Sequence, residues 1–293
     1  MHIPIKIRRT EPTPARLLAG ICQSCIALLA ISVLGWSAPA QTGSTVASPC
    51  NLALVPALTI RCVSFAGHWY AVADVDLRSE AIAITSTVDS KPETLPAVAN
   101  TFARRGGKPL LVTNAGIYGS DDRPLGLLIS PEGRLQGVNR SQGRGNFFWD
   151  SAIFQTLDDH TASILDAQSW HDGPHMVAAT QSGPQLASSG KVNPNLPSQS
   201  KSAFRRTAVG IDQADRHIVH IAVSDDAVTL LELATFMVNT VHCSEVLHLD
   251  GDLSAFYIPS SPGKFIFADP GERIVTALIV TKKTQNSSPR VGK

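Results

Sequence analysis

The sequence predicts an α+β fold: a single β-rich domain with a mixed sheet core and a few flanking helices. Short segments rich in β-branched and aromatic residues recur along most of the chain, whereas only two segments carry apolar residues at clear helical spacing. Many strands with few helices are typical of α+β packing. The chain has 293 residues, of which 43% are hydrophobic, so it can bury one full core and one domain is expected.

Residues 1–40 are predicted to be a secretory signal peptide. Basic side chains precede an apolar stretch at 17–36, and the small residues at 38–40 suit a cleavage site. An uncleaved membrane anchor is the alternative, because the stretch approaches the roughly 20 residues that span a bilayer. A lipid anchor on Cys22 or Cys25 is a third and weaker alternative. The protein is therefore expected to be exported, either periplasmic or secreted, with membrane attachment only through this segment.

Charge excludes one class of partner. Cleavage would remove four basic and one acidic residue from the 25 and 24 of the whole chain, which leaves a formal charge of −2. No basic surface for nucleic acid is implied, so no nucleic-acid partner is expected.

Three cysteines remain after cleavage, and an oxidising compartment allows one disulfide among them. The pair Cys50 and Cys62 is favoured because it closes a short loop ahead of the first strand. Cys243 is then expected to be a buried thiol. The cysteines have no zinc-site spacing, and the sequence predicts neither a metal nor another cofactor.

The first ordered elements are expected after a small, polar linker at residues 41–49. The segments 59–63 and 69–77 alternate apolar and polar residues and are rich in β-branched and aromatic side chains, with Gly67 between them. This pattern predicts a hairpin, and 81–85 continues it as a third strand.

A helix and a short strand are predicted next. Apolar residues recur at helical spacing from 95 to 103, basic residues suit the C-terminal end, and Gly106 ends the helix. The strand 109–113 follows and stops at Asn114.

A second module repeats this order. Thr229 and Glu232 have capping-box spacing, and apolar residues continue at helical intervals to Val241. The strand 246–249 follows directly and stops at Asp250, which a glycine follows.

These two strand ends form the first candidate site. A strand that stops at Asp250 and Gly251 places a carboxylate at a sharp bend, where glycine lets a ligand approach closely. A plain loop turn is the alternative. Because each residue ends a helix and strand module, Asn114 and Asp250 are expected to lie in one place.

The remaining strands share alternating or buried patterns between turn signals. They are expected at 125–130, 134–138, 151–156, 161–167, 176–180, 207–211, 217–223 and 273–281. Residues 284–293 form a polar tail, expected to be disordered.

Other candidate residues lie in loops and at strand ends. Arg205 and Arg206 precede a predicted strand, where a guanidinium could grip a phosphate or carboxylate, although solvated surface charges are the alternative. The loop 143–148 lacks the Gly-Lys-Ser/Thr of a phosphate loop and is expected to place Asn146. Ser182 lacks a nucleophile elbow and is expected to position a ligand. Each histidine is expected to be structural or solvated.

Six motifs follow one another along the chain: Asn114-Ala115-Gly116-Ile117-Tyr118, Pro124-Leu125-Gly126-Leu127, Gly145-Asn146-Phe147-Phe148, Gln181-Ser182-Gly183-Pro184, Arg206-Thr207-Ala208-Val209-Gly210-Ile211, and Leu249-Asp250-Gly251 through Ser254. Together, in this order, they resemble the phosphodiester glycosidase family, over roughly residues 63–281. The resemblance implies hydrolysis of a sugar-1-phosphodiester, which releases the sugar and leaves a phosphomonoester. Because an anomeric phosphate is already a good leaving group, the protein needs a carboxylate and stabilisation of phosphate charge more than a strong acid.

The resemblance also implies roles for residues. Asp250 is expected to act as nucleophile, general base or oxocarbenium stabiliser, Asn114 to orient the sugar, and Arg206 to clamp the phosphate. The residues that shape the substrate pocket are then Asn146, Ser182, Gly183, Gly251 and Ser254. A second carboxylate, if required, would come from Asp121, Asp122, Asp150 or Glu245.

One departure from the family's animal members affects the expected substrate. The animal members carry a run of glycines after the aspartate, whereas this chain has Asp252 and Leu253, a form associated with bacterial members. The expected substrate is therefore a phosphodiester in an envelope or extracellular glycan. The alternatives are a non-catalytic envelope protein that binds a glycan, and a metal-dependent phosphodiesterase, which the missing cluster of His and Asp ligands disfavours.

Overall fold

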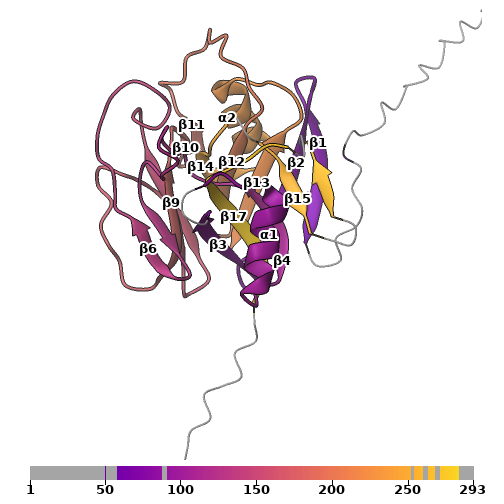
Figure 1. Cartoon of the computed structure of the whole chain (residues 1–293). Coiled ribbons are helices and arrows are strands. Elements are labelled where there is room, and N and C mark those ends of the chain that lie inside the picture. Colours follow the sequence, from indigo (N-terminus) through magenta and orange to yellow (C-terminus); the bar gives the residue numbers. More distant parts are fainter. Residues whose placement is uncertain are drawn as a thin grey trace, which may run out of the picture. The chain divides into compact units, whose positions relative to one another are not determined.

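Three antiparallel β-sheets and two α-helices make up the described residues (Figure 1). The computed structural model describes residues 50, 58–87, 91–251, 254–259, 263–267 and 271–283. All of them belong to one compact unit of the chain, Ala47–Lys293. The predicted signal peptide, the predicted linker and the predicted C-terminal tail lie outside the described residues.

The first sheet has seven strands and carries the second helix–strand module. Its spatial order is β1 (Thr59–Phe65), β2 (His68–Asp76), β13 (Ile218–Ser224), β12 (Thr207–Asp212), β14 (Cys243–His248), β10 (Gln185–Ser188) and β11 (Lys191–Val192). The predicted hairpin of β1 and β2 is confirmed, with Phe65 paired to His68 at the turn.

The second and third sheets have five strands each. The second runs β16 (Lys264–Ile266), β15 (Phe256–Ile258), β4 (Pro109–Asn114), β17 (Thr276–Lys282) and β3 (Glu80–Ser86). The third runs β6 (Gly133–Gln136), β5 (Leu128–Ser130), β9 (Met176–Ser182), β7 (Ala152–Leu157) and β8 (Ala162–Asp166).

The predicted mixed sheet is wrong, because every strand pairing in the described residues is antiparallel. Two strands joined through a helix usually lie side by side and parallel. Here a third strand lies between them in both cases. β17 separates β3 from β4, and β12 separates β13 from β14, each running antiparallel to both neighbours.

Both predicted helices are confirmed with the expected starts. In α1 (Leu95–Arg104) the Thr94 side chain accepts a hydrogen bond from the backbone of Ala97. In α2 (Leu230–Asn239) Thr229 and Glu232 form a reciprocal capping box. Capping satisfies amide groups that have no partner inside the helix. Figure 1 shows α1 beside β4 and β17, and α2 beside β10, β11 and β14.

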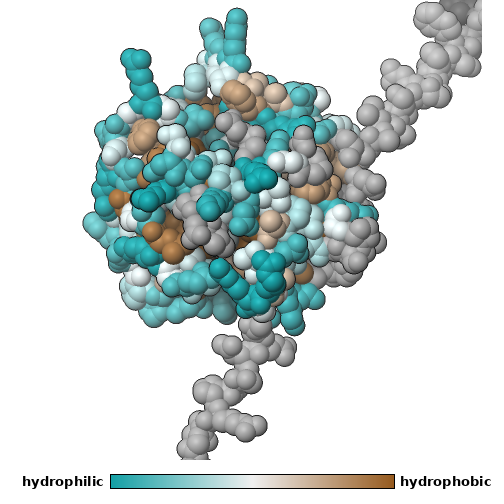
Figure 2. Space-filling model, in the orientation of Figure 1, coloured by the Kyte–Doolittle hydropathy of each residue, from teal (hydrophilic) through white to brown (hydrophobic). Residues whose placement is uncertain are grey.

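A single large apolar cluster joins the three sheets. It includes Ile221 of the first sheet, Ile84 and Leu278 of the second, and Phe154 and Ile164 of the third. This packed core therefore holds the strands rigidly, including the strand ends that carry polar residues. On the face seen in Figure 2 the surface is mostly hydrophilic, with apolar residues in small separate groups. The helices that the structure describes are too short or too polar to cross a membrane.

The predicted disulfide between Cys50 and Cys62 is present, and Cys243 is a buried free thiol. The two bridged residues are 12 positions apart. A bridge closing a loop of this size is expected to stabilise the protein by about 3 kcal/mol, by restricting the unfolded chain. Urea denaturation of wild type and a C50S/C62S double variant measures this difference. A reductant should destabilise the wild type but not the double variant. Equal urea midpoints of the two proteins without reductant would contradict the prediction.

Candidate functional site

The ends of β4 and β14 meet where two different sheets come together. The backbone N–H of Asp250 donates to the carbonyl of Ala115 at 2.9 Å. The side-chain amide of Asn114 donates to the backbone carbonyl of Asp250. Next to it, the N–H of Leu249 donates to Thr207 O at 2.9 Å. The structure therefore brings Asn114 and Asp250 together, as the two modules predicted.

Asn114 acts here on the backbone of Asp250. Its side-chain oxygen accepts hydrogen bonds from Thr207 Oγ1 at 2.8 Å and Thr113 Oγ1 at 3.0 Å. The residue is only 1% exposed, whereas Asp250 is partly exposed. The geometry makes Asn114 a positioning residue, and its predicted contact with a sugar stays a prediction.

Arg206 lies just before β12 and is buried, with 2% of its surface exposed. The solvated alternative is therefore wrong for Arg206, whereas Arg205 is exposed. The Arg206 guanidinium donates from Nε to Val228 O at 2.8 Å and from Nη2 to Ser202 O at 3.0 Å. These carbonyls fix its orientation. Its Cζ also lies 5.5 Å from the centroid of the Phe204 ring, within the range of a cation–π contact.

His248 links Arg206 to the neighbouring strand end. Its Nδ1 lies 2.9 Å from the carbonyl oxygen of Gly183, and its Nε2 lies 3.3 Å from Arg206 Nη1. Because a carbonyl only accepts, Nδ1 carries the proton and Nε2 accepts from the guanidinium. Burial, and then the charge of Arg206, lower the pKa of His248 to about 3, although the bond to Gly183 opposes this. The imidazole is therefore neutral at ordinary pH.

Sequence reasoning did not select His248 for the site. A usable signal was its place at the end of a predicted strand, two residues before Asp250. His248 is 1% exposed, so its predicted structural character holds, but it contacts a candidate binding residue.

Two glycines let the chain approach this group closely. A Cβ at Gly251 would lie 3.1 Å from His248 Nε2 and 3.4 Å from Arg206 Nη1. A Cβ at Gly183 would lie 2.6 Å from the backbone oxygen of Asn146. Asn146, Gly183, His248, Arg206 and Gly251 therefore form one connected group, which we call the arginine cluster.

Gly183→Ala is expected to destabilise the protein by about 1–3 kcal/mol. The new methyl group would meet backbone atoms at Asn146 and Phe147, so the loop has to shift. The midpoint of thermal or urea unfolding measures the effect. Gly137→Ala is the matched control, because a Cβ there meets nothing within 4 Å. Equal stability of the two variants would contradict the close approach.

Two predicted substrate-binding serines are buried. Ser254 Oγ donates to Gly251 O at 3.3 Å. Ser182 ends β9, is fully buried, and its hydroxyl has no hydrogen-bond partner among the described residues. A substrate contact stays a prediction for both.

Gln181 is a structural residue that was named from the sequence only as part of a motif, with no role of its own. It is 1% exposed. Its Oε1 accepts from the backbone N–H of Leu127 at 3.0 Å and of Asn139 at 2.9 Å, and its Nε2 donates to Ser151 Oγ at 2.7 Å. Gln181 thus ties three loops together beside Gly183.

Two of the possible second carboxylates bind neighbouring loops. Glu245 accepts from Gln185 Nε2 and from the backbone N–H of Ser189, each at 2.9 Å. Asp150 accepts from the side chain of Asn193. Within the described ranges, no three His, Cys, Asp or Glu residues come together so that they could hold a metal ion.

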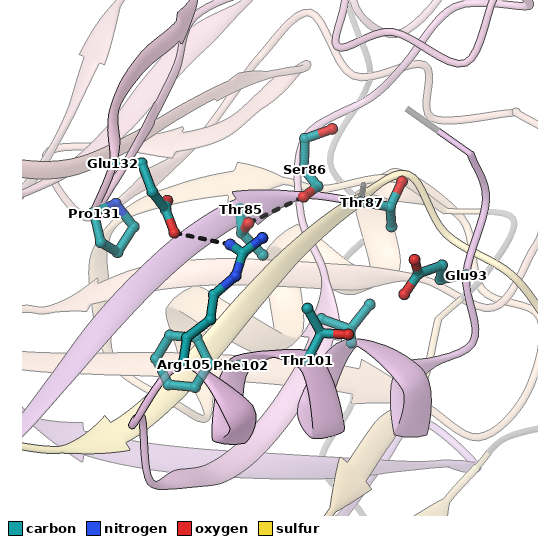
Figure 3. Close-up of a pocket in the computed structure, with 10 residues that line it drawn as sticks. Thr85, Ser86, Thr87, Glu93, Thr101, Phe102, Arg105, Pro131 and Glu132 are labelled. Atoms are coloured by element: carbon teal, nitrogen blue, oxygen red, sulfur yellow. Dashed lines mark hydrogen bonds and ion pairs between the residues drawn. The ribbon is translucent and has the colours of Figure 1, made fainter. Parts of the chain in front are cut away.

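A small pocket lies away from the arginine cluster, between α1, the end of β3 and the turn at 131–132. Figure 3 shows Arg105 and Glu132 facing each other at its edge, with Arg105 Nη1 and Glu132 Oε1 at 2.9 Å. Ser86 and Thr87 hydroxyl groups are buried there without a hydrogen-bond partner among the described residues. Its volume of about 30 Å³ suits a water molecule rather than a sugar.

A larger pocket borders the arginine cluster. Arg206 and Asn146 both line it, and its volume is about 340 Å³. That volume falls within the range of small-molecule sites. This pocket, rather than the small one, is the candidate for substrate binding.

The chain is similar to known proteins in sequence and in fold. The phosphodiester glycosidase family model matches residues 107–281. The uncharacterized protein YigE of Escherichia coli (strain K12) is 29% identical over 154 residues, which cover 52% of this chain and 59% of that protein. The matched part is thus less than two thirds of that relative.

Two solved structures share the fold. One is the catalytic domain of zebrafish N-acetylglucosamine-1-phosphodiester alpha-N-acetylglucosaminidase, auto-inhibited by its pro-peptide. It has a TM-score of 0.55 and 17% identity, over 77% of this chain and 82% of that chain. The other is a hypothetical protein from Synechocystis, with a TM-score of 0.51 and 14% identity, over 77% of this chain and 62% of that chain.

Proposed function

Because the chain belongs to the phosphodiester glycosidase family, we propose that it is an exported hydrolase that cleaves a sugar-1-phosphodiester in an envelope or extracellular glycan. The observation that carries the proposal is the junction of β4 and β14. There Asn114 and Ala115 hold the backbone of Asp250, and Gly251 places the chain against Arg206.

The proposed chemistry uses one carboxylate and one cation. Asp250 stabilises the oxocarbenium-like transition state or attacks the anomeric carbon, directly or through water. The bond between the anomeric carbon and the bridging oxygen breaks, and that oxygen leaves with the phosphate. Arg206 offers a positive charge for the phosphate in a buried setting, where electrostatic interactions are stronger than in water.

A non-catalytic protein that binds an envelope glycan is the second candidate. The buried side chains that meet at the arginine cluster support it equally, because Arg206, His248 and Gly183 build a rigid binding surface whether or not a bond is broken. Turnover therefore has to be measured directly.

A panel of sugar-1-phosphodiesters tests the proposal. The purified protein is expected to release a free sugar and a phosphomonoester in equal amounts from at least one member. Binding of panel members without turnover would overturn the enzyme and favour the glycan-binding protein. Loss of turnover on chelation, restored by one particular ion, would favour a metal-dependent phosphodiesterase.

A further inference from the structure

The larger pocket beside the arginine cluster has two chemically different ends. The segment 143–149, the segment 197–202 and the first turn of α2 enclose it. We call it the Trp149 pocket. The side chains that give it its character are Arg144, Trp149, Pro197, Arg206, Leu230 and Leu231.

One wall of the Trp149 pocket is apolar. Trp149, Leu230 and Leu231 are each partly exposed and pack with part of their surface against the core beneath α2. Their remaining surface lines a concave space. Apolar surface in a pocket stays in contact with water unless a ligand covers it, and covering it is favourable.

The other end is cationic. The Arg206 guanidinium is buried, and Arg144 is exposed on the loop. Both side chains are positively charged and line the pocket, so this end favours an anionic group. Because Arg206 Nη1 also contacts His248 and faces Gly251, the cationic end is shared with the strand end that bears Asp250.

We propose that the Trp149 pocket binds the alcohol that is esterified to the phosphate opposite the sugar, and that this alcohol carries an apolar chain. The substrate class is then a sugar-1-phosphodiester of a lipid alcohol. The phosphate lies at Arg206, and the chain runs over Trp149 and Leu231. This inference rests on the proposed hydrolase function and specifies its substrate.

The reaction balances with water as the only co-reactant. Water supplies the hydroxyl of the released sugar, and its other proton passes to the released phosphate oxygen or to solvent. The bond between the anomeric carbon and the bridging oxygen breaks, and that oxygen leaves with the phosphate as an alkyl phosphomonoester. Asn146, Ser200 and Ser202 also line the pocket and could bind a second sugar. The wall formed by Pro197, Leu230 and Leu231 suits an apolar chain better, because these side chains form no hydrogen bonds.

The test compares three diesters of the same sugar, α-N-acetylglucosamine 1-phosphate, and repeats the set with α-glucose 1-phosphate. The second ester group is methyl, octyl or a hexose. The kcat/KM for the octyl diester is expected to exceed that for the methyl diester at least ~10-fold, since each buried methylene favours binding. Leu231→Asn is expected to remove most of this preference for the octyl diester. Leu165→Asn, at a leucine that is 42% exposed on β8, is the control.

Each outcome separates the two proposals. Equal rates for methyl and octyl diesters, or a preference for the hexose diester that Trp149→Ala abolishes, would overturn the lipid inference while hydrolysis stands. Absence of turnover with every diester would overturn the hydrolase instead. Calorimetry with octyl phosphate and methyl phosphate then tests the pocket alone. Octyl phosphate is expected to bind at least ~10-fold more tightly than methyl phosphate, and Leu231→Asn to lose this difference. Equal affinities of the wild type for the two phosphates would refute the proposed apolar chain in the pocket.

Discussion

Asp250→Asn is expected to lower kcat/KM for a sugar-1-phosphodiester by about 10³-fold or more while the protein stays folded. Asparagine keeps the shape of the side chain. The backbone bonds of residue 250 to Ala115 and Asn114 do not involve the carboxylate. The change therefore removes the negative charge that stabilises an oxocarbenium-like transition state, or the nucleophile itself, without removing the junction.

The control for this variant is a carboxylate of the same type on the surface. Asp172 pairs with Arg134 on exposed side chains, and such pairs contribute little to stability. Asp172→Asn should keep full activity. Urea denaturation of both variants shows whether the fold is intact. A folded Asp250→Asn protein that keeps more than about a tenth of the activity would remove Asp250 from the chemistry.

Added azide or formate distinguishes two of the roles left open for Asp250, nucleophile and general base. With Asp250→Ala, a small anion can occupy the space of the lost carboxylate. Formation of a glycosyl azide whose anomeric configuration is inverted indicates a nucleophile, because azide then attacks the face that Asp250 used. Faster hydrolysis without a sugar adduct indicates a general base.

Local sequence signals predicted the elements but not the order of the strands. The capping box at Thr229 and Glu232 depends on residues three apart, so the sequence displays it directly. The position of β17 between β3 and β4 depends on pairing across most of the domain, such as Leu278 with Thr113. The mixed sheet predicted from the sequence therefore does not occur among the described strands.

Short strands were also missed for a physical reason. The strands β10, β11, β15 and β16 have two to four residues each, too few to show alternation. The turn between β10 and β11 places Ser189 and Gly190 at positive φ. The strand pairing with β14, rather than local preference, stabilises β10.

The part of the candidate site that lies at strand ends was predictable, because a short motif marks each of these ends in the sequence. Asp250 and Asn114 stand at strand ends, and the structure brings them together. The partners of Arg206 could not be read from sequence, because Ser202, Val228 and His248 reach it from three different segments. Whether a guanidinium is buried depends on those segments meeting.

His248 is expected to make the protein less stable as the pH falls below about 6.5. The unfolded chain binds a proton at His248 near pH 6.5, whereas in the folded protein burial and then Arg206 lower its pKa to about 3. Between these values the unfolded state holds more protons. The free energy of unfolding therefore falls by up to about 1.4 kcal/mol for each pH unit in this window, and the full contribution is present above pH 6.5.

His248→Asn isolates this effect, because asparagine does not titrate and its amide can still donate to Gly183 O. The variant leaves the Arg206 donor without its acceptor, so it should be about 1–3 kcal/mol less stable at pH 7. Its stability should then change less than that of the wild type between pH 6.5 and 4.5. Urea denaturation at fixed ionic strength measures both slopes, with exposed His171→Gln as the control. Equal pH slopes for the wild type and His248→Asn would mean that His248 is protonated in the folded protein. Two cations would then lie 3.3 Å apart. His248 could not be the neutral acceptor that orients Arg206.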